Sequence, residues 1–166
     1  MRIAGIDGST KKTGFAIFDD GQYVKHILFD HHKFADSTVR IEKMIKDIWM
    51  ALSDENPDVV RMEESMMTTN VDTVKKLSNI AGAVWAWCVM NKKEFIFLLP
   101  SEWRKKIGLR QGRSIKRDVL KAEAITAVKQ EYNIAVTDDE AEAILIARSG
   151  FDLPKIIITE DDIWGI

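Results

Sequence analysis

Four acidic residues stand where the sequence predicts the end of a strand or the start of a helix. Asp7 and Glu63 each follow a short apolar segment, and Asp139 and Glu142 lie three residues apart on one face of a predicted helix. Carboxylates gathered at one place repel one another, and Mg²⁺ or Mn²⁺ relieves that repulsion because these cations favour oxygen ligands. Two such ions about 4 Å apart can activate water and stabilise the leaving oxygen in phosphodiester hydrolysis.

Each of these acids also has a purely structural interpretation. Asp7 precedes Gly8, and an aspartate before glycine often serves only a turn. Glu63 and its neighbour Glu64 could both be solvated, and the acids at 138–140 could serve only the cap and the dipole of a helix. Residue types and spacing leave both interpretations open.

The hydrophobic pattern predicts the elements that would position the acids. Predicted strands are short apolar or alternating segments that end at turn residues, over residues 2–6, 14–19, 23–29, 58–62 and 95–99. Asp20-Gly21 is typical of a hairpin turn. Predicted helices have apolar residues at helical spacing, over residues 37–52, 71–90, 114–132 and 137–147, with Ser37 and Thr137 as expected N-caps.

The order of the predicted strands and helices along the chain indicates an α/β fold in a single domain over residues 1–166. The expected sheet is mixed and five-stranded, with three antiparallel strands followed by two parallel ones and with helices on its faces. If the first and fourth strands are parallel neighbours, Asp7 and Glu63 emerge at the same edge. The carboxyl ends of parallel strands are where open α/β sheets place their sites.

Composition limits the class of protein. The chain has 166 residues, of which 46% are hydrophobic and 30% charged, with a net charge of −2 and one cysteine. That cysteine, Cys88, cannot form an intramolecular disulfide, which fits a reducing cytoplasm. The longest apolar run, 80–90, is too short to span a bilayer, and Asp7 interrupts any secretion signal. We therefore expect a cytoplasmic protein without a membrane anchor.

The segment 101–121 is strongly basic although the chain is acidic overall. Only Glu102 and Asp118 oppose its basic residues, so it could bind a phosphate backbone, or it could simply be a solvated helix face. Lys75 and Lys76 form a second basic pair. The candidate DNA contacts in the basic segment are Arg104, Lys105, Lys106, Arg110, Arg113, Lys116 and Arg117.

Three segments together resemble the RuvC family of Holliday-junction resolvases, including its phage-borne relatives. Ile-Ala-Gly-Ile-Asp-Gly-Ser at 3–9, continued by Thr-Gly-Phe-Ala at 13–16, is similar to the first-strand motif of the family. The segment 62–70, followed by Asp72, Lys76, Leu77 and Gly82, matches the second motif, and 139–147 resembles the closing one. The resemblance extends from Ile3 to about Arg148.

The resemblance implies a ribonuclease-H-like fold and an endonuclease that cuts Holliday junctions and other branched DNA. It implies that Asp7, Glu63, Asp139 and Glu142 are catalytic and hold two Mg²⁺ ions, for which Mn²⁺ would substitute. The register of the second motif selects Glu63 over Glu64. The chain departs from the family where Gly8 follows Asp7 directly, without the usual proline, and where Glu142 replaces an aspartate.

The resemblance also implies how DNA is held. Met66 stands where the family commonly has a large aromatic residue against the junction, and Lys76 belongs to the second motif. Family members act as homodimers, and the apolar helix 71–90 is the expected dimer face, with Trp85 or Trp87 as anchor. Burial of these tryptophans in the core is the alternative. The expected setting is a bacterial cell or a phage-infected host.

Other functions remain open at this stage. Asp7-Gly8-Ser9 with Thr13-Gly14 mimics the first phosphate loop of sugar-kinase or actin-like ATPases, but those proteins need two such domains. A ribonuclease H or a proofreading exonuclease would share the fold and the metals. A non-enzymatic alternative is a branched-DNA-binding module with impaired catalysis.

Overall fold

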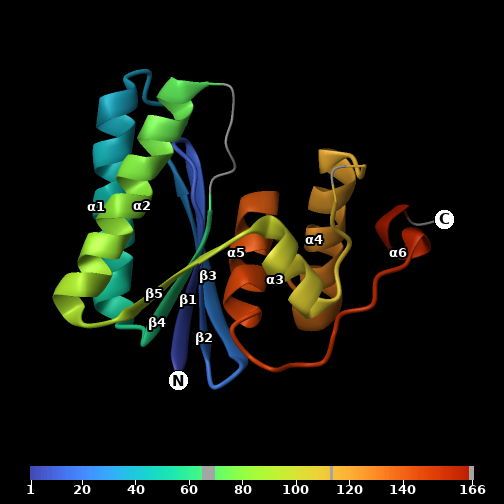
Figure 1. The fold of residues 1–166 in the computed structure, drawn as a ribbon. Coiled ribbons are helices and arrows are strands. Elements are labelled where there is room, and N and C mark those ends of the chain that lie inside the picture. The colour runs from blue at the N-terminus through green and yellow to red at the C-terminus, as the bar shows by residue number, and fades with distance from the viewer. Residues whose placement is uncertain (65–69, 113, 165–166) are drawn as a thin grey trace.

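The computed structural model describes residues 1–64, 70–112 and 114–164. Within these ranges the chain forms the elements shown in Figure 1, in the order β1 (Arg2–Asp7), β2 (Lys12–Asp19), β3 (Gln22–Asp30), α1 (Ser37–Glu55), β4 (Val59–Glu63), α2 (Val71–Asn91), β5 (Glu94–Leu98), α3 (Pro100–Ile107), α4 (Arg117–Tyr132), α5 (Asp138–Arg148) and α6 (Glu160–Trp164).

The strands form one sheet in the order β3-β2-β1-β4-β5. β1, β2 and β3 pair antiparallel, whereas β4 pairs parallel with both β1 and β5. The β2–β3 hairpin closes at Asp20 and Gly21, whose φ angles of 47° and 80° are both positive, as the turn that matches strand twist requires. The predicted mixed sheet is confirmed.

Helices cover both faces of the sheet. α1 and α2 lie on one face, and α5, flanked by α3 and α4, lies on the other (Figure 1). Because side chains alternate along a strand, each strand contributes side chains to two hydrophobic cores, one on each face of the sheet. Ile6 and Phe15 belong to the core under α1 and α2, whereas Ile3 and Phe18 belong to the core under α5.

Two glycines let α5 lie unusually close to the sheet. A Cβ atom at Gly14 would lie 2.0 Å from the carbonyl oxygen of Asp139, and one at Gly5 would lie 2.3 Å from that of Ala143. Gly14 is paired with Asp7 across the β1–β2 ladder. The same close approach therefore places the start of α5, with Asp139, beside the end of β1.

Helix boundaries differ from the sequence-based expectation in three places. Asp36, not Ser37, caps α1, because its carboxylate accepts from the backbone N–H groups of Thr38 and Val39 at 2.7 and 3.0 Å. α4 begins at Arg117 rather than 114, after a turn in which Gly112 has a φ of 125°. The short helix α6 was not predicted. Thr137 caps α5 as predicted, within a reciprocal capping box.

α2 has one buried and one exposed apolar face. Trp87 is 3% exposed and Cys88 is buried, both in the core beneath α1 and α2, and the Trp87 indole donates to Ser53 Oγ at 3.1 Å. Of the two roles left open by the sequence, Trp87 therefore has that of a core residue and not that of a dimer anchor. Trp85 is 57% exposed and stacks on Phe95.

None of the described helices is long and apolar enough to cross a membrane.

Candidate active site

The predicted acids converge on one pocket at an edge of the sheet. Ile6 pairs with Met62 in the parallel β1–β4 ladder, so the residues that follow them, Asp7 and Glu63, end neighbouring strands. Alternation directs both side chains toward α5, whose first turns contribute Asp139 and Glu142. All four line a cavity of about 510 Å³, which we call the carboxylate pocket.

Burial and mutual repulsion make these carboxylates hard to ionise. Burial raises the pKa of Asp7 well above its usual value, and the charges of Glu142 and Glu63 raise it further. Burial, with repulsion from Glu142, raises the pKa of Glu63 to about 7. Burial also raises the pKa of both Asp139 and Glu142. The pocket therefore favours a bound proton or a bound cation.

The donor set fits a hard divalent cation. Among the described residues, no three Asp, Glu, His or Cys side chains are already grouped closely enough to hold a metal ion. The carboxylate pocket nevertheless offers oxygen donors only, which Mg²⁺ and Mn²⁺ favour over nitrogen or sulfur. A cation there would offset the repulsion that raises the pKa of Asp7.

Two neighbouring residues of α3 each contact one acid of the pocket. The indole Nε1 of Trp103 donates to Glu63 Oε2 at 2.7 Å, and Nη1 of Arg104 lies 3.6 Å from Glu142 Oε1. Both contacts stabilise the charged carboxylate, so they oppose the effect of burial on its pKa.

Sequence reasoning missed Trp103. The available signal was its place in a helix that starts at Pro100, directly after a strand ending at the same sheet edge.

Arg104 is not the exposed DNA contact that we expected. It is 2% exposed, and its guanidinium binds Glu123 and two backbone carbonyl groups. A basic residue in a basic run is normally solvated, but here Glu123 of α4 provides a buried counter-charge. Arg104 lines the carboxylate pocket from within the protein.

The other candidate DNA contacts fall into three groups: exposed residues, residues paired with acids, and residues outside the described ranges. Lys105 and Lys106 are exposed at the end of α3, and Lys116 is exposed at the start of α4. Arg117 is also exposed and lines the carboxylate pocket. Arg110 is partly buried against Glu123 and Glu160, and Lys76 is paired with Asp72. Met66 and Arg113 lie outside the described residues.

Sequence comparison identifies a family over most of the chain. The model of the family described as "Crossover junction endodeoxyribonuclease RuvC" matches residues 3–148. Curated proteins of that description include one from Caldicellulosiruptor saccharolyticus, 23% identical over 98% of this chain and 99% of the relative. Another, from Nitratiruptor sp., is 26% identical over 89% of this chain and 96% of the relative.

Solved structures share the fold. RuvC of T. thermophilus in complex with a Holliday junction substrate superposes with a TM-score of 0.72 at 15% identity, over 90% of this chain and 91% of that one. The Fowlpox virus resolvase, in complex with Holliday junction DNA, gives a TM-score of 0.61 at 16% identity, over 90% and 96%. The predicted ribonuclease-H-like fold is thereby confirmed. Because the family model matches residues 3–148, the chain belongs to the RuvC family of crossover junction endodeoxyribonucleases.

Proposed function

We propose that this protein is a structure-selective endodeoxyribonuclease that cuts phosphodiester bonds at Holliday junctions and other branched DNA. The observation that carries the proposal is the convergence of Asp7, Glu63, Asp139 and Glu142 on one pocket in a chain of the RuvC family. These residues come from two neighbouring strand ends and one helix, so the fold itself brings them together.

Nucleases of this family use divalent metal ions, and the four carboxylates are the groups that we propose hold them here. We favour two Mg²⁺ ions, with Mn²⁺ able to substitute, because the donors are all oxygen atoms. When bound, such ions activate the attacking water and stabilise the leaving oxygen. The protein's own part is to fix the carboxylates, and the contacts of Trp103 and Arg104 support that role.

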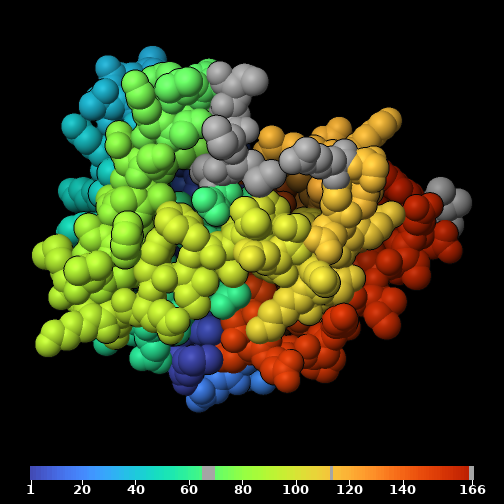
Figure 2. Space-filling model, viewed as in Figure 1, coloured from blue at the N-terminus to red at the C-terminus, as the bar shows by residue number. Residues whose placement is uncertain are grey.

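We further propose that exposed basic residues beside the pocket bind the DNA backbone. Arg117 supports this because it is exposed and lines the carboxylate pocket, and Lys105, Lys106 and Lys116 are exposed in the same basic segment. On the face shown in Figure 2, the segment from β5 through α3 (yellow) lies between α2 (green) and α4 (orange). Arg110, Lys76 and the undescribed Met66 and Arg113 remain candidate contacts from the sequence.

We propose that the active form is a homodimer, formed through the exposed face of α2. Trp85, Val89 and Met90 on this helix are 57%, 65% and 72% exposed, which is unusual for apolar side chains of this size unless they meet a partner. A second copy of the chain would cover them.

We expect the protein to act in the cytoplasm of a bacterium or of a phage-infected host.

The proposal is tested by incubating the purified protein with synthetic four-way, three-way and linear DNA and with a DNA–RNA hybrid, each with and without Mg²⁺ or Mn²⁺. We expect cleavage of the branched DNA only when metal is present. Preferential cleavage of the hybrid would instead indicate a ribonuclease H. Binding of the junction without any cleavage would indicate a branched-DNA-binding module.

The matched variant is Asp7→Asn, which keeps the size of the side chain but removes its charge. We expect it to bind the four-way junction like the wild type in a gel-shift assay and to lose cleavage almost completely. Undiminished cleavage by this variant would contradict the site assignment.

A further inference from the structure

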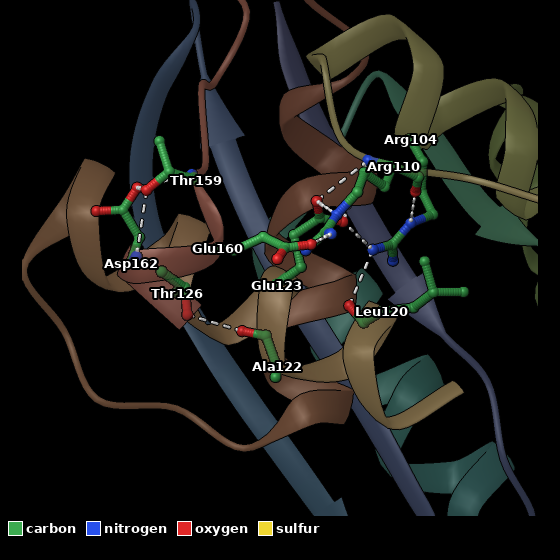
Figure 3. A network of polar contacts seen from close by, with 9 residues as sticks. All are labelled: Arg104, Arg110, Leu120, Ala122, Glu123, Thr126, Thr159, Glu160 and Asp162. Atoms are coloured by element: carbon green, nitrogen blue, oxygen red, sulfur yellow. Dashed lines mark hydrogen bonds and ion pairs between the residues drawn. The ribbon is translucent and has the colours of Figure 1, made fainter. Parts of the chain in front are cut away.

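A chain of alternating charges connects the C-terminal helix α6 to the carboxylate pocket. Figure 3 shows the part of this chain from Glu160 to Arg104. Glu160 lies 3.2 Å from Nη1 of Arg110, and Nε of Arg110 donates to Glu123 Oε1 at 2.9 Å. Glu123 Oε2 accepts from Nη2 of Arg104 at 2.9 Å, and Nη1 of Arg104 faces Glu142 at 3.6 Å. Glu123 stands at the centre of this series.

The central pair is buried and geometrically fixed. The side chains of Arg104 and Glu123 are 3% and 2% exposed. Nε of Arg104 donates to the carbonyl of Arg110 at 2.8 Å, and Nη2 also donates to the carbonyl of Leu120 at 2.9 Å. These contacts hold the guanidinium plane in place, so that Nη1 is the nitrogen presented to Glu142.

The balance of charge decides how strongly Arg104 attracts Glu142. A buried arginine without a counter-charge is costly, so it pairs with whatever carboxylate is within reach. With the Glu123 carboxylate 2.9 Å from Nη2 of Arg104, the contact of Arg104 to Glu142 is longer, at 3.6 Å. Without the charge of Glu123, Arg104 would have Glu142 as its nearest acid and would compete with a metal ion for that carboxylate.

We propose that Glu123 is a positioning residue for the active site, which binds Arg104 and thereby leaves Glu142 free to act as a metal ligand. This rests on the proposed metal-binding role of Glu142. Glu123 itself does not line the carboxylate pocket. It acts through Arg104, and Arg110 shares its charge from the other side.

The test is Mn²⁺ binding to the Glu123→Gln variant, measured by calorimetry without DNA. Glutamine keeps the size of the side chain and removes the charge. We expect one of two bound Mn²⁺ ions to bind about tenfold more weakly. In cleavage assays, the Mn²⁺ concentration for half-maximal rate should rise while the rate at saturating Mn²⁺ is nearly restored.

Glu131→Gln is the matched control. Glu131 also lies on α4 and also pairs with a buried arginine, Arg148, at 3.0 Å, but neither residue lines the carboxylate pocket. We expect Glu131→Gln to lower the melting temperature and to leave both Mn²⁺ affinities unchanged. Glu123→Asp, which keeps the charge, should retain most of the Mn²⁺ affinity that Glu123→Gln loses.

Arg110→Gln provides a prediction of opposite sign and does not depend on Glu123→Gln folding. In this variant Glu123 keeps the hydrogen bonds from the backbone N–H of residue 110 but loses the Arg110 guanidinium, so its charge is shared with Arg104 only. Glu142 is then freer, and the weaker Mn²⁺ ion should bind severalfold more tightly. Unchanged or weaker Mn²⁺ binding in Arg110→Gln would overturn the proposal, as would unchanged Mn²⁺ binding in a folded Glu123→Gln. A wild-type protein that binds Mn²⁺ but does not cut junctions would instead contradict the proposed function only.

Discussion

Trp103 and Arg104 are neighbours in the sequence, and each contacts a different acid of the carboxylate pocket. They can do so because α3 begins at Pro100, directly after β5, and therefore lies against the edge where β1 and β4 end. The indole N–H has no charge, so it stabilises ionised Glu63 without competing with a cation for it. Arg104 carries a charge and needs Glu123 to balance it.

The raised pKa of Glu63 predicts how stability depends on pH when no metal is present. Burial raises that pKa from 4.5 to about 7 in the folded protein. Between these pH values the folded protein keeps a proton on Glu63 that the unfolded chain releases, so the contribution of Glu63 to the free energy of unfolding falls as pH rises and levels off above about 7. The fall from Glu63 alone is at most on the order of 3 kcal/mol. Urea unfolding in EDTA from pH 4.5 to 8.5 measures it, and Mg²⁺ at pH 8 should restore stability.

Trp103→Phe sharpens this measurement. Loss of the hydrogen bond that lowers the pKa of Glu63 should extend the fall in stability to higher pH. Trp49→Phe is the control, because it removes an indole hydrogen bond of 3.0 Å to the Ala83 carbonyl, on the far side of the sheet. A stability that does not fall between pH 4.5 and 7, or an identical pH range for Trp103→Phe and wild type, would contradict the environment assigned to Glu63.

The position of single residues was predicted well where a motif indicates it and poorly where it depends on tertiary contacts. The sequence predicted that the four acids lie together, because each stands at a recognisable end of an element. It misplaced Arg104, because nothing in a basic run reveals that Glu123, one helix away, will bury one of its members. Trp87 was offered as a surface anchor, although its place in the core depends on how α2 turns toward the sheet.

At the scale of elements, the closeness of α5 to β1 and β2 determines the geometry of the pocket. α5 carries two of the four acids and is buried along most of its length. It can lie that close only because Gly5 and Gly14 have no side chains. These glycines are therefore as much part of the site's construction as the acids are.

Gly14→Ala tests this construction. The new Cβ would meet the backbone carbonyl of Asp139 at 2.0 Å, so α5 must move away from the sheet. We expect a loss of at least about 2 kcal/mol in the free energy of unfolding and weaker Mn²⁺ binding at the same time. Gly82→Ala on α2 is the control: no atom lies within 4 Å of its Cβ, so it should be neutral or stabilising by up to about 1 kcal/mol. Wild-type Mn²⁺ affinity in Gly14→Ala would show that α5 does not need this approach.

The elements with strong periodicity were predicted almost to their ends, including every strand of the sheet and the pairing of β1 with β4. The differences lie where local signals are weak. α4 starts three residues later than expected, because the chain first makes a turn between Gly112 and Ile115, whose N–H donates to the Gly112 carbonyl. α6 is too short for a periodic pattern, and its packing depends on contacts such as that of Glu160 with Arg110.

At the scale of the whole molecule, the exposed face of α2 continues onto the edge strand β5. Phe97 on β5 is 42% exposed and lies edge-on to Phe95, on which Trp85 stacks. The apolar surface is thus shared by a helix and a sheet edge, and both would be covered by a second copy.

A dimer through this surface predicts a change of mass in solution. The wild-type protein, of 18.9 kDa per chain, should sediment as a dimer in analytical ultracentrifugation. Trp85→Ser combined with Val89→Ser should sediment as a monomer, because it removes two exposed apolar side chains from the face. Met50→Ser on α1, also at an exposed apolar residue (55%), is the control and should remain dimeric. A monomeric wild type, or a dimeric double variant, would contradict this interface.

The carboxylate pocket draws on the first strand and on the last long helix of the chain. During synthesis, a ribosome therefore releases Asp7 long before Asp139 and Glu142. A nascent or prematurely terminated chain can contain the basic segment of α3 and α4, but it lacks two of the four acids that line the carboxylate pocket. With the catalytic role proposed for these acids, we expect a chain that ends before α5 not to cut DNA.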